Sequence, residues 1–235
     1  MSEVMTKTEM DQRYHQLQLM YEALRHAVSH SINDPIRLTE VECDALLAKK
    51  DLPADIEHRV KVIQMSAKEV ARCLTILKEF AYIRESHFTT VDLNKVFSIA
   101  CDHLKDQLAA TEAKITCDAL PKVHGNQGQL IQLAEHLIQN AIQYNQKSRP
   151  EISIRSRTQG DMIEIAIQDN GVGINPLYQR LVFRAFQRLN QQQSFAGMGM
   201  GLAFSQKIVH EHGGQIWFES QEGKGSTFFF TLRRG

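Results

Sequence analysis

The segment Asp169-Asn170-Gly171-Val172-Gly173-Ile174, followed by Gly197-Met198-Gly199-Met200-Gly201-Leu202, decides the fold of this chain. Glycines allow the backbone to approach a ligand closely and leave N–H groups free to face phosphate oxygens. A buried carboxylate ahead of the first cluster can accept a hydrogen bond from an adenine amino group. A single Gly-x-Gly indicates only a tight turn, but two separated clusters, the first led by an acid, indicate a nucleotide pocket.

The flanking residues support this interpretation. Residues 162–167 alternate apolar and polar side chains, which predicts a half-buried strand that ends near Asp169. The second cluster precedes a predicted helix over residues 202–210, whose N-terminal N–H groups and dipole favour an anion. The alternating glycines follow a polar loop instead of a strand and no Walker A lysine is present, so neither a dinucleotide fingerprint nor a P-loop is indicated.

Composition narrows the class of protein. The chain has 235 residues, of which 43% are hydrophobic and 23% charged, as in ordinary soluble proteins with two modest cores. Lys plus Arg and Asp plus Glu both total 27, so we expect no nucleic-acid partner. The widely spaced cysteines form no Cys-x-x-Cys pair and are expected to be reduced core thiols: Cys43, Cys73, Cys101 and Cys117. Without a signal peptide or an apolar run long enough to span a bilayer, we expect a cytoplasmic chain with no membrane span.

The first domain, residues 1–86, is predicted to be an antiparallel helical hairpin. One helix is expected over residues 9–49 and a second over residues 55–84, with a break at Lys50-Asp51-Leu52-Pro53. Each arm carries one apolar stripe at steps of three and four: Leu17, Met20, Leu24, Ala27 and Ser31 in the first, and Ile56, Val60, Ile63, Ala67, Val70, Leu74, Leu77 and Ala81 in the second. A dimeric four-helix bundle covers both stripes, and the alternative is a hairpin packed on the rest of its own chain.

The second domain, residues 87–235, is predicted to be an α/β sandwich, which makes the whole chain α+β. Helices are expected near residues 93–107 and 128–143, and strands near residues 113–117, 151–156, 162–168, 215–219 and 227–232. Gly213-Gly214 should end the helix after the second glycine cluster, and Gly223-Lys224-Gly225 should form the turn between the last two strands.

Four motifs in this order resemble the N, G1, F and G2 boxes of sensor histidine kinases. They are Glu135-His136-Leu137-Ile138-Gln139-Asn140-Ala141-Ile142-Gln143-Tyr144-Asn145, the first glycine cluster, Val182-Phe183-Arg184-Ala185-Phe186-Gln187-Arg188-Leu189, and the second glycine cluster. Upstream, Val28-Ser29-His30-Ser31-Ile32-Asn33-Asp34-Pro35-Ile36-Arg37 resembles the H box of a dimerisation and histidine-phosphotransfer hairpin, closest to the phytochrome-like type. The resemblance implies a Bergerat-type ATP-binding domain.

The resemblance also implies a role for particular residues. His30 would be the phosphoacceptor that attacks the γ-phosphorus of ATP, and Asn140 would bind Mg²⁺. Asp169, Tyr144 and Thr227 would form the adenine pocket; Gly171, Gly173, Gly197, Gly199 and Gly201 would shape the pocket and its lid; Phe183 and Phe186 would anchor the lid; and Arg188 would lie near the phosphates. The implied partners are a second copy of the chain, the receiver domain of a response regulator, and a separate or upstream sensory module.

Three positions depart from the family pattern. Ser31 follows His30 where the family has Asp or Glu, so Asp34, four residues on, is a candidate substitute base. Gln143 replaces a common Lys, and His136 replaces a common first Asn of the N box. Ser31 and Gln143 support an alternative function, a catalytically weak or inactive dimeric phosphotransfer or docking scaffold for a receiver domain. A third possible function is that of an ATP-driven clamp, as in the chaperone, gyrase and mismatch-repair proteins that share this nucleotide fold. Such proteins use a Glu at the position of His136 to activate water, so the sequence does not support this function.

Overall fold

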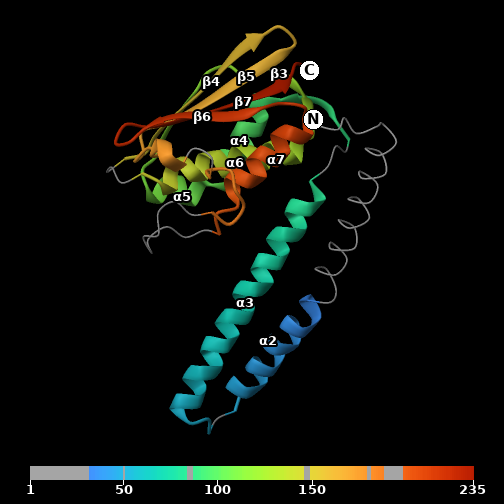
Figure 1. Cartoon of the computed structure of the whole chain (residues 1–235), viewed down its shortest axis with the longest axis vertical. Helices are drawn as coiled ribbons and strands as arrows, with labels where there is room; N and C mark the ends of the chain where they lie inside the picture. The colour runs from blue at the N-terminus through green and yellow to red at the C-terminus, as the bar shows by residue number, and fades with distance from the viewer. Residues whose placement is uncertain (1–31, 50, 84–86, 146–148, 179–180, 188–197) are drawn as a thin grey trace, which may run out of the picture. The chain divides into compact units, whose positions relative to one another are not determined.

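The computed structural model describes residues 32–49, 51–83, 87–145, 149–178, 181–187 and 198–235. The described residues form two compact units, one that ends at Tyr82 and one from Ile83 to Gly235 (Figure 1). In the first unit, α2 (Asn33–Leu47) and α3 (Ala54–Tyr82) run antiparallel as a hairpin. Pro35 lies in the first turn of α2, where backbone N–H groups have no intrahelical acceptor. The N–H that proline lacks therefore costs the helix no hydrogen bond. Of the predicted first helix, the stretch before Ile32 lies outside the described residues.

The predicted apolar stripe of α3 divides into two halves. Val60, Ala67 and Leu74 are buried, with 6%, 8% and 6% of their surface exposed. The intervening members of the stripe, Ile56, Ile63 and Val70, are 40%, 52% and 44% exposed. The stripe of the first arm, Leu17 to Ser31, lies outside the described residues. Within the described hairpin, α3 therefore buries one edge of its seam and leaves the other edge open to solvent.

The second unit contains a five-stranded sheet in the order β2-β4-β5-β7-β6. Its strands are β2 (Lys114–Cys117), β4 (Glu151–Gln159), β5 (Met162–Asp169), β6 (Ile216–Gln221) and β7 (Gly225–Arg233). β2 runs parallel to β4, and the other neighbours are antiparallel. The helices α4 (Leu93–His103), α6 (Gln127–Gln143) and α7 (Gly201–Glu211) cover one face of this sheet, as Figure 1 shows. The result is the two-layer α/β sandwich that the sequence predicted.

The core lies between the sheet and these helices. Alternate residues of β5, Ile163, Ile165 and Ile167, are at most 1% exposed, as are Leu137 of α6 and Ile208 of α7. Strand alternation turns the intervening side chains of the sheet to the opposite, polar face. The same alternation fixes which strand residues point toward the helices.

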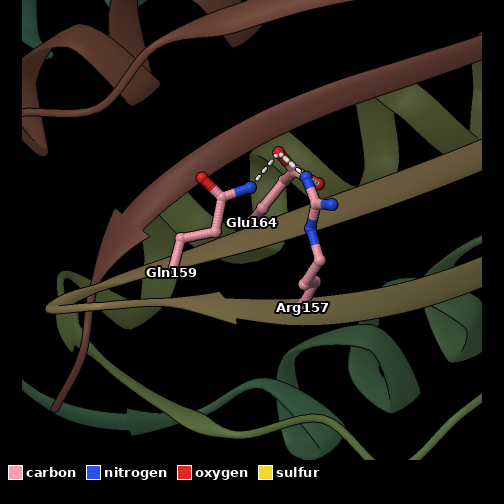
Figure 2. Close-up of polar contacts among 3 residues, drawn as sticks. All are labelled: Arg157, Gln159 and Glu164. Carbon is pink, nitrogen blue, oxygen red and sulfur yellow. Dashed lines mark hydrogen bonds and ion pairs between the residues drawn. The ribbon is translucent and has the colours of Figure 1, made fainter.

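Figure 2 shows one polar network on the strands β4 and β5. Arg157 and Glu164 are direct partners in the ladder, and their side chains form an ion pair of 3.0 Å. The side-chain amide of Gln159 donates a second hydrogen bond of 2.9 Å to the same carboxylate. The Arg157 side chain is well exposed, so the network adds little to the stability of the fold. We infer that it helps to fix the register between β4 and β5.

Two local features differ from the sequence prediction, and a third agrees with it. β1 (Thr89–Asp92) and β3 (Lys122–Gly125) form an additional antiparallel pair, which the sequence did not reveal because four residues carry too short a pattern. The helix predicted over residues 93–107 is two helices, α4 and α5 (Lys105–Ala110), because Leu104 leaves the helical conformation with φ −97° and ψ 8° and buries its side chain. The helix end predicted at Gly213-Gly214 is confirmed, since Gly213 has φ +69° and the Gly214 N–H donates to the Val209 carbonyl at 2.9 Å.

All four cysteines are free thiols. Cys43 is buried, Cys73 and Cys101 are half-buried, and Cys117 is exposed on the edge strand β2, so the predicted core location holds fully for Cys43 alone. Among the described helices, none combines the length and the apolar character needed to cross a bilayer.

Candidate nucleotide-binding site

Asp169 forms the floor of the site at the C-terminal end of β5. It is 9% exposed and continues the buried face of Ile163, Ile165 and Ile167, because strand residues two apart share a face. Its Oδ1 accepts the backbone N–H of Gly171 at 2.8 Å and that of Ser226 at 3.1 Å. Hydrogen bonds from two backbone donors offset the cost of burying this carboxyl group. The acid predicted to read an adenine amino group is therefore rigidly held.

The first glycine cluster lies against two other backbone segments. The Val172 N–H donates to the Tyr144 carbonyl at 3.0 Å, and a Cβ on Gly171 would lie 2.7 Å from that same carbonyl oxygen. Gly173 has φ +73°, and a Cβ there would lie 2.2 Å from the Gln221 carbonyl oxygen. Both separations are shorter than van der Waals contact, so close backbone packing requires glycine at these two positions.

Ser226, and not Thr227, lies beside Asp169. β7 buries Ser226, Phe228 and Phe230 in alternation, whereas Thr227 pairs with Gln168 and shares its face of the sheet, opposite to Asp169. The structure therefore does not bring the sequence-predicted Thr227 into the site. The alternation of apolar residues along β7 could have indicated Ser226, because Ser226 lies two residues before the buried Phe228. Which set of alternate residues lies on the face of Asp169 is decided by the pairing of β7 with β5.

Two more polar residues that sequence reasoning missed hold the loop in place. Ser220 accepts the Ile174 N–H at 2.7 Å and lies 2.9 Å from the Ser226 hydroxyl, so it ties the first glycine cluster to the last strand. The Asn170 side chain accepts the Glu151 N–H at 2.9 Å and donates to the Arg149 carbonyl at 3.2 Å. Asn145, just beyond the end of α6, also donates to Asn170. These contacts fix the loop between α6, β4 and the β6–β7 turn.

The helix α6 supplies the next group of predicted residues. Leu133, Leu137 and Ala141 are 1%, 1% and 3% exposed and face the core, as their spacing predicted. Asn140 and Tyr144 are half-buried and lie one helical turn apart. In the described part of the chain, no side-chain hydrogen bond engages the Asn140 amide. Asn140 thus offers an amide oxygen one helical turn before Tyr144, whose carbonyl accepts the Val172 N–H of the first glycine cluster.

The second glycine cluster opens α7. Gly199 has φ +68°, and a Cβ there would lie 2.6 Å from the Gln187 carbonyl oxygen. α7 begins at Gly201, and its N-cap residue Met200 makes no side-chain cap. Because the N–H groups of a first helical turn have no intrahelical partner, this end suits an anion such as a phosphate. Gly197 and Arg188, also predicted for the site, lie outside the described residues.

The two predicted lid anchors behave differently. The ring of Phe183 packs edge-on against Phe218, at 6.1 Å between centroids, and Phe218 in turn lies 5.7 Å from Phe228. Phe186 is 48% exposed and has φ +60°, an uncommon conformation for a bulky residue. Phe183 is thus joined to the aromatic core, and Phe186 is not.

The predicted catalytic residues belong to the first unit. His30 lies outside the described residues. Asp34 is exposed in the first turn of α2, where its negative charge is favourable for the helix dipole.

A hollow of about 310 Å³ lies at the β2–β4–β5 part of the sheet. Strand alternation places several of its lining side chains on the polar face of the sheet: Glu151, Ser153, Arg155 and Gln168. The lining also includes Asp169 and Asn170 at the end of β5, so the hollow reaches the edge of the candidate site. In the described part of the chain, no group of three or more His, Cys, Asp or Glu side chains could hold a metal ion. A metal at Asn140 would therefore need ligands from the nucleotide phosphates, as is usual for Mg²⁺.

Comparisons with known proteins agree with this geometry. Residues 125–235 match the family described as histidine kinase-, DNA gyrase B-, and HSP90-like ATPase. The chain is 33% identical over 217 residues to the phytochrome-like protein Cph1 of Synechocystis sp., which covers 89% of this chain and 29% of Cph1. It is 31% identical over 213 residues to the sensor-like histidine kinase SenX3 of Mycolicibacterium smegmatis, which covers 87% of this chain and 55% of SenX3.

Solved structures show the same fold. The structure of the histidine kinase ThkA in complex with the response regulator protein TrrA matches with a TM-score of 0.61 at 22% identity, and the match covers 100% of this chain and 68% of ThkA. The present chain spans only part of these curated relatives, 29% of the length of Cph1 and 55% of the length of SenX3.

Proposed function

We propose a specific activity for this chain, which belongs to the sensor histidine kinases: it phosphorylates its own His30 with Mg²⁺-ATP and passes the phosphoryl group to an aspartate of a response regulator. The observation that carries the proposal is the buried Asp169 carboxylate, which the N–H groups of Gly171 and Ser226 hold at the end of β5. A carboxylate fixed in this way can accept a hydrogen bond from the adenine amino group, which selects ATP over nucleotides with other bases.

The residues around the second glycine cluster fit the phosphate end of the nucleotide. The first turn of α7 offers backbone N–H groups, and Gly199 allows that backbone to approach closely. The Asn140 amide oxygen and the Tyr144 side chain come from the neighbouring helix, α6. When bound, Mg²⁺ would neutralise charge on the phosphates, with Asn140 as its protein ligand. The described donor set fits this ion, since Mg²⁺ is commonly held by one or two protein groups together with nucleotide phosphates.

The chemical step is a substitution at the γ-phosphorus. A neutral imidazole nitrogen of His30 forms the new N–P bond, the bond from the γ-phosphorus to the oxygen of ADP breaks, and the proton of the attacking imidazole leaves to a base. Near neutral pH, a large fraction of histidine side chains are unprotonated, which makes this nucleophile available. In the second step, an aspartate oxygen of the response regulator takes the phosphoryl group and His30 is regenerated.

Asp34 is the proposed base for the first step. It is exposed in the first turn of α2, four residues after His30, and Ser31 cannot take a proton in the way that the usual acidic residue does. We expect Asp34→Asn to slow phosphorylation of His30 while nucleotide binding is unchanged. An unchanged rate would remove Asp34 from the mechanism.

A second copy of the chain completes the first unit in this proposal. Ile56, Ile63 and Val70 form an exposed row with a spacing of seven residues, next to the buried row of Val60, Ala67 and Leu74. In a four-helix bundle each helix packs against two neighbours, so one row would face α2 and the other a partner helix. This pattern supports a homodimer.

The response-regulator partner rests on similarity. ThkA, whose fold this chain shares, was solved in complex with the response regulator TrrA. We propose a receiver domain as the acceptor here and the cytoplasm as the place of reaction, because ATP is available there.

The proposal is tested by incubating the chain with γ-labelled ATP and Mg²⁺, alongside His30→Gln and Asn140→Ala. We expect acid-labile, alkali-stable label on the unmodified chain and no label on either variant. Binding of ATP without any label would instead favour the scaffold function, which Ser31 and Gln143 suggested. In that case, transfer from phosphorylated receiver domain back to His30 becomes the informative assay.

A further inference from the structure

The hollow at β2, β4 and β5 carries a surplus of positive charge. Three cationic residues line it: Lys114 of β2, Arg155 of β4 and Lys224 of the β6–β7 turn. Its acidic lining residues are Glu151 and Asp169, but Asp169 is buried and belongs to the face that the helices cover. Among the lining residues, the Glu151 carboxylate alone therefore opposes the three cations, which leaves two positive charges unbalanced.

Arg155 differs in its environment from Arg157, which lies two residues further along the same face of β4. Arg157 is the ladder partner of Glu164 and forms an ion pair with it, as Figure 2 shows. The ladder partner of Arg155 is Ala166, which has no charge to offer. Within the described residues, no ion pair engages any of the three cations of the hollow. These side chains are therefore available to an anion from solution.

Hydrogen-bonding side chains form the floor of the hollow between the cations. Thr116, Ser153 and Gln168 are ladder partners across β2, β4 and β5, so they lie in one row on one face. Because β2 and β4 are parallel, Lys114 lies at one end of this row and Arg155 at the other. No side-chain hydrogen bond engages the Ser153 hydroxyl or the Gln168 amide within the described residues. Such donors, flanked by cations, suit the oxygens of an anion.

The hollow is large enough for more than a single ion, and one of its walls is rigid. Its volume of about 310 Å³ lies at the lower end of the range for small-molecule pockets, about 300–1,000 Å³. In its wall, the Asn170 side chain accepts the Glu151 N–H at 2.9 Å and donates to the Arg149 carbonyl at 3.2 Å. A wall that is already in place lowers the entropy cost of binding a ligand.

We propose that this hollow binds a small organic phosphate monoester. The planar guanidinium of Arg155 matches two phosphate oxygens, and the Ser153 hydroxyl and the Gln168 amide donate to the phosphate from the floor. Above pH 7 the phosphate of a monoester carries a charge close to −2, which balances the two unpaired positive charges of the hollow. The floor lies on the face of the sheet opposite to the helices, so this site differs from the proposed phosphate seat at α7, and the inference does not rest on kinase activity.

The test is a titration of the full chain with glycerol 3-phosphate at pH 8, followed by the amide chemical shifts of ¹⁵N-labelled protein. We expect saturable shifts at Ser153, Arg155 and Gln168. Arg155→Gln should raise the Kd by on the order of tenfold, because a charge-assisted hydrogen bond is lost. Arg157→Gln is the matched control on the same strand and face, and it should change the Kd by no more than about twofold.

Further arms of the titration distinguish the alternatives. Lys224→Gln alters an exposed turn, should also weaken binding several-fold, and serves as a second variant if Arg155→Gln folds poorly. Inorganic phosphate should bind more weakly than the ester, and equal affinity would mean that the hollow holds only the free ion. Saturable shifts confined to the first turn of α7, or equal effects of Arg155→Gln and Arg157→Gln, would overturn the proposal. None of these outcomes bears on the proposed phosphorylation of His30.

Discussion

Oδ1 of Asp169 accepts the backbone N–H of Ser226 at 3.1 Å, so the acid that ends β5 also fixes the start of β7. The same oxygen accepts the N–H of Gly171 at 2.8 Å. One buried carboxylate therefore holds both walls of the proposed adenine pocket. Any change to Asp169 acts on folding and on nucleotide recognition together, and suitable substitutions separate the two effects.

Asp169→Asn and Asp169→Ala should differ in stability and agree in binding. The Asn oxygen can still accept both backbone N–H groups, whereas Ala leaves two buried donors without that acceptor, at about 1–3 kcal/mol each. Urea unfolding should show Asp169→Ala less stable than Asp169→Asn by several kcal/mol. Both variants should lose ATP affinity in calorimetry. Equal stability of the two variants would contradict the role of the two N–H contacts.

Gly173→Ala should destabilise the second unit far more than Gly160→Ala. Both glycines have positive φ, +73° and +58°, so the backbone strain of about 1–2 kcal/mol is common to both substitutions. A Cβ at Gly173 would lie 2.2 Å from the Gln221 carbonyl oxygen, whereas a Cβ at Gly160 meets no atom within 4 Å. Thermal unfolding in the absence of nucleotide measures the difference. Similar melting temperatures for the two variants would mean that the loop has room for a side chain.

Ile63→Asp should weaken the dimer, and Met65→Asp should not. Both side chains are exposed in the described hairpin, at 52% and 70%. Ile63 belongs to the row of Ile56 and Val70, whereas Met65 lies on the opposite side of α3 by its helical spacing. A carboxylate in an apolar interface carries a desolvation cost that it avoids on a free surface. Molar mass by light scattering over a concentration series measures the effect, and equal masses for the two variants would exclude this row as the interface.

Alkylation of Cys117 should show a pH profile displaced to higher pH in the folded chain. Partial desolvation of the sulfur raises the pKa of the Cys117 thiol, although the residue as a whole is exposed, and the charge of Asp118 acts in the same direction. Since the thiolate is the reactive form, the folded protein has less of it at a given pH than the chain in urea, where the thiol regains its ordinary value. The rate of iodoacetamide modification against pH, with and without urea, measures the displacement. A folded profile at lower pH than the unfolded one would contradict the raised pKa of this thiol.

The sequence predicted those features that depend on residue type or on long patterns. Asp169, Gly171 and Gly173 could be assigned because few residue types tolerate their positions, and the inward face of α6 followed from a period repeated over four turns. The choice between Ser226 and Thr227 could not be made in this way. Both are small hydroxyl residues, and only the register between β7 and β5 decides which one faces Asp169.

Other features escaped prediction because they are local. β1 and β3 are each four residues long, too short to show an alternating pattern above background. The break between α4 and α5 involves Leu104 alone, and the helical spacing of apolar residues continues on both sides of it. The sequence pattern therefore does not reveal this break. The side chains of Ser220 and Asn170 act through contacts with backbone 46 and 19 residues away in sequence, which residue spacing does not reveal.

The most direct test of the central claim is to locate the phosphoryl group after reaction with Mg²⁺-ATP. Tandem mass spectrometry under mildly alkaline conditions, with a fragmentation method that preserves phosphohistidine, assigns the modified residue. We predict a single phosphoryl group on His30 of the unmodified chain and none in Asp169→Asn at the same ATP concentration. Phosphorylation of a different residue, or a chain that binds ATP and remains unmodified, would contradict the assignment of this protein as a histidine kinase that acts on His30.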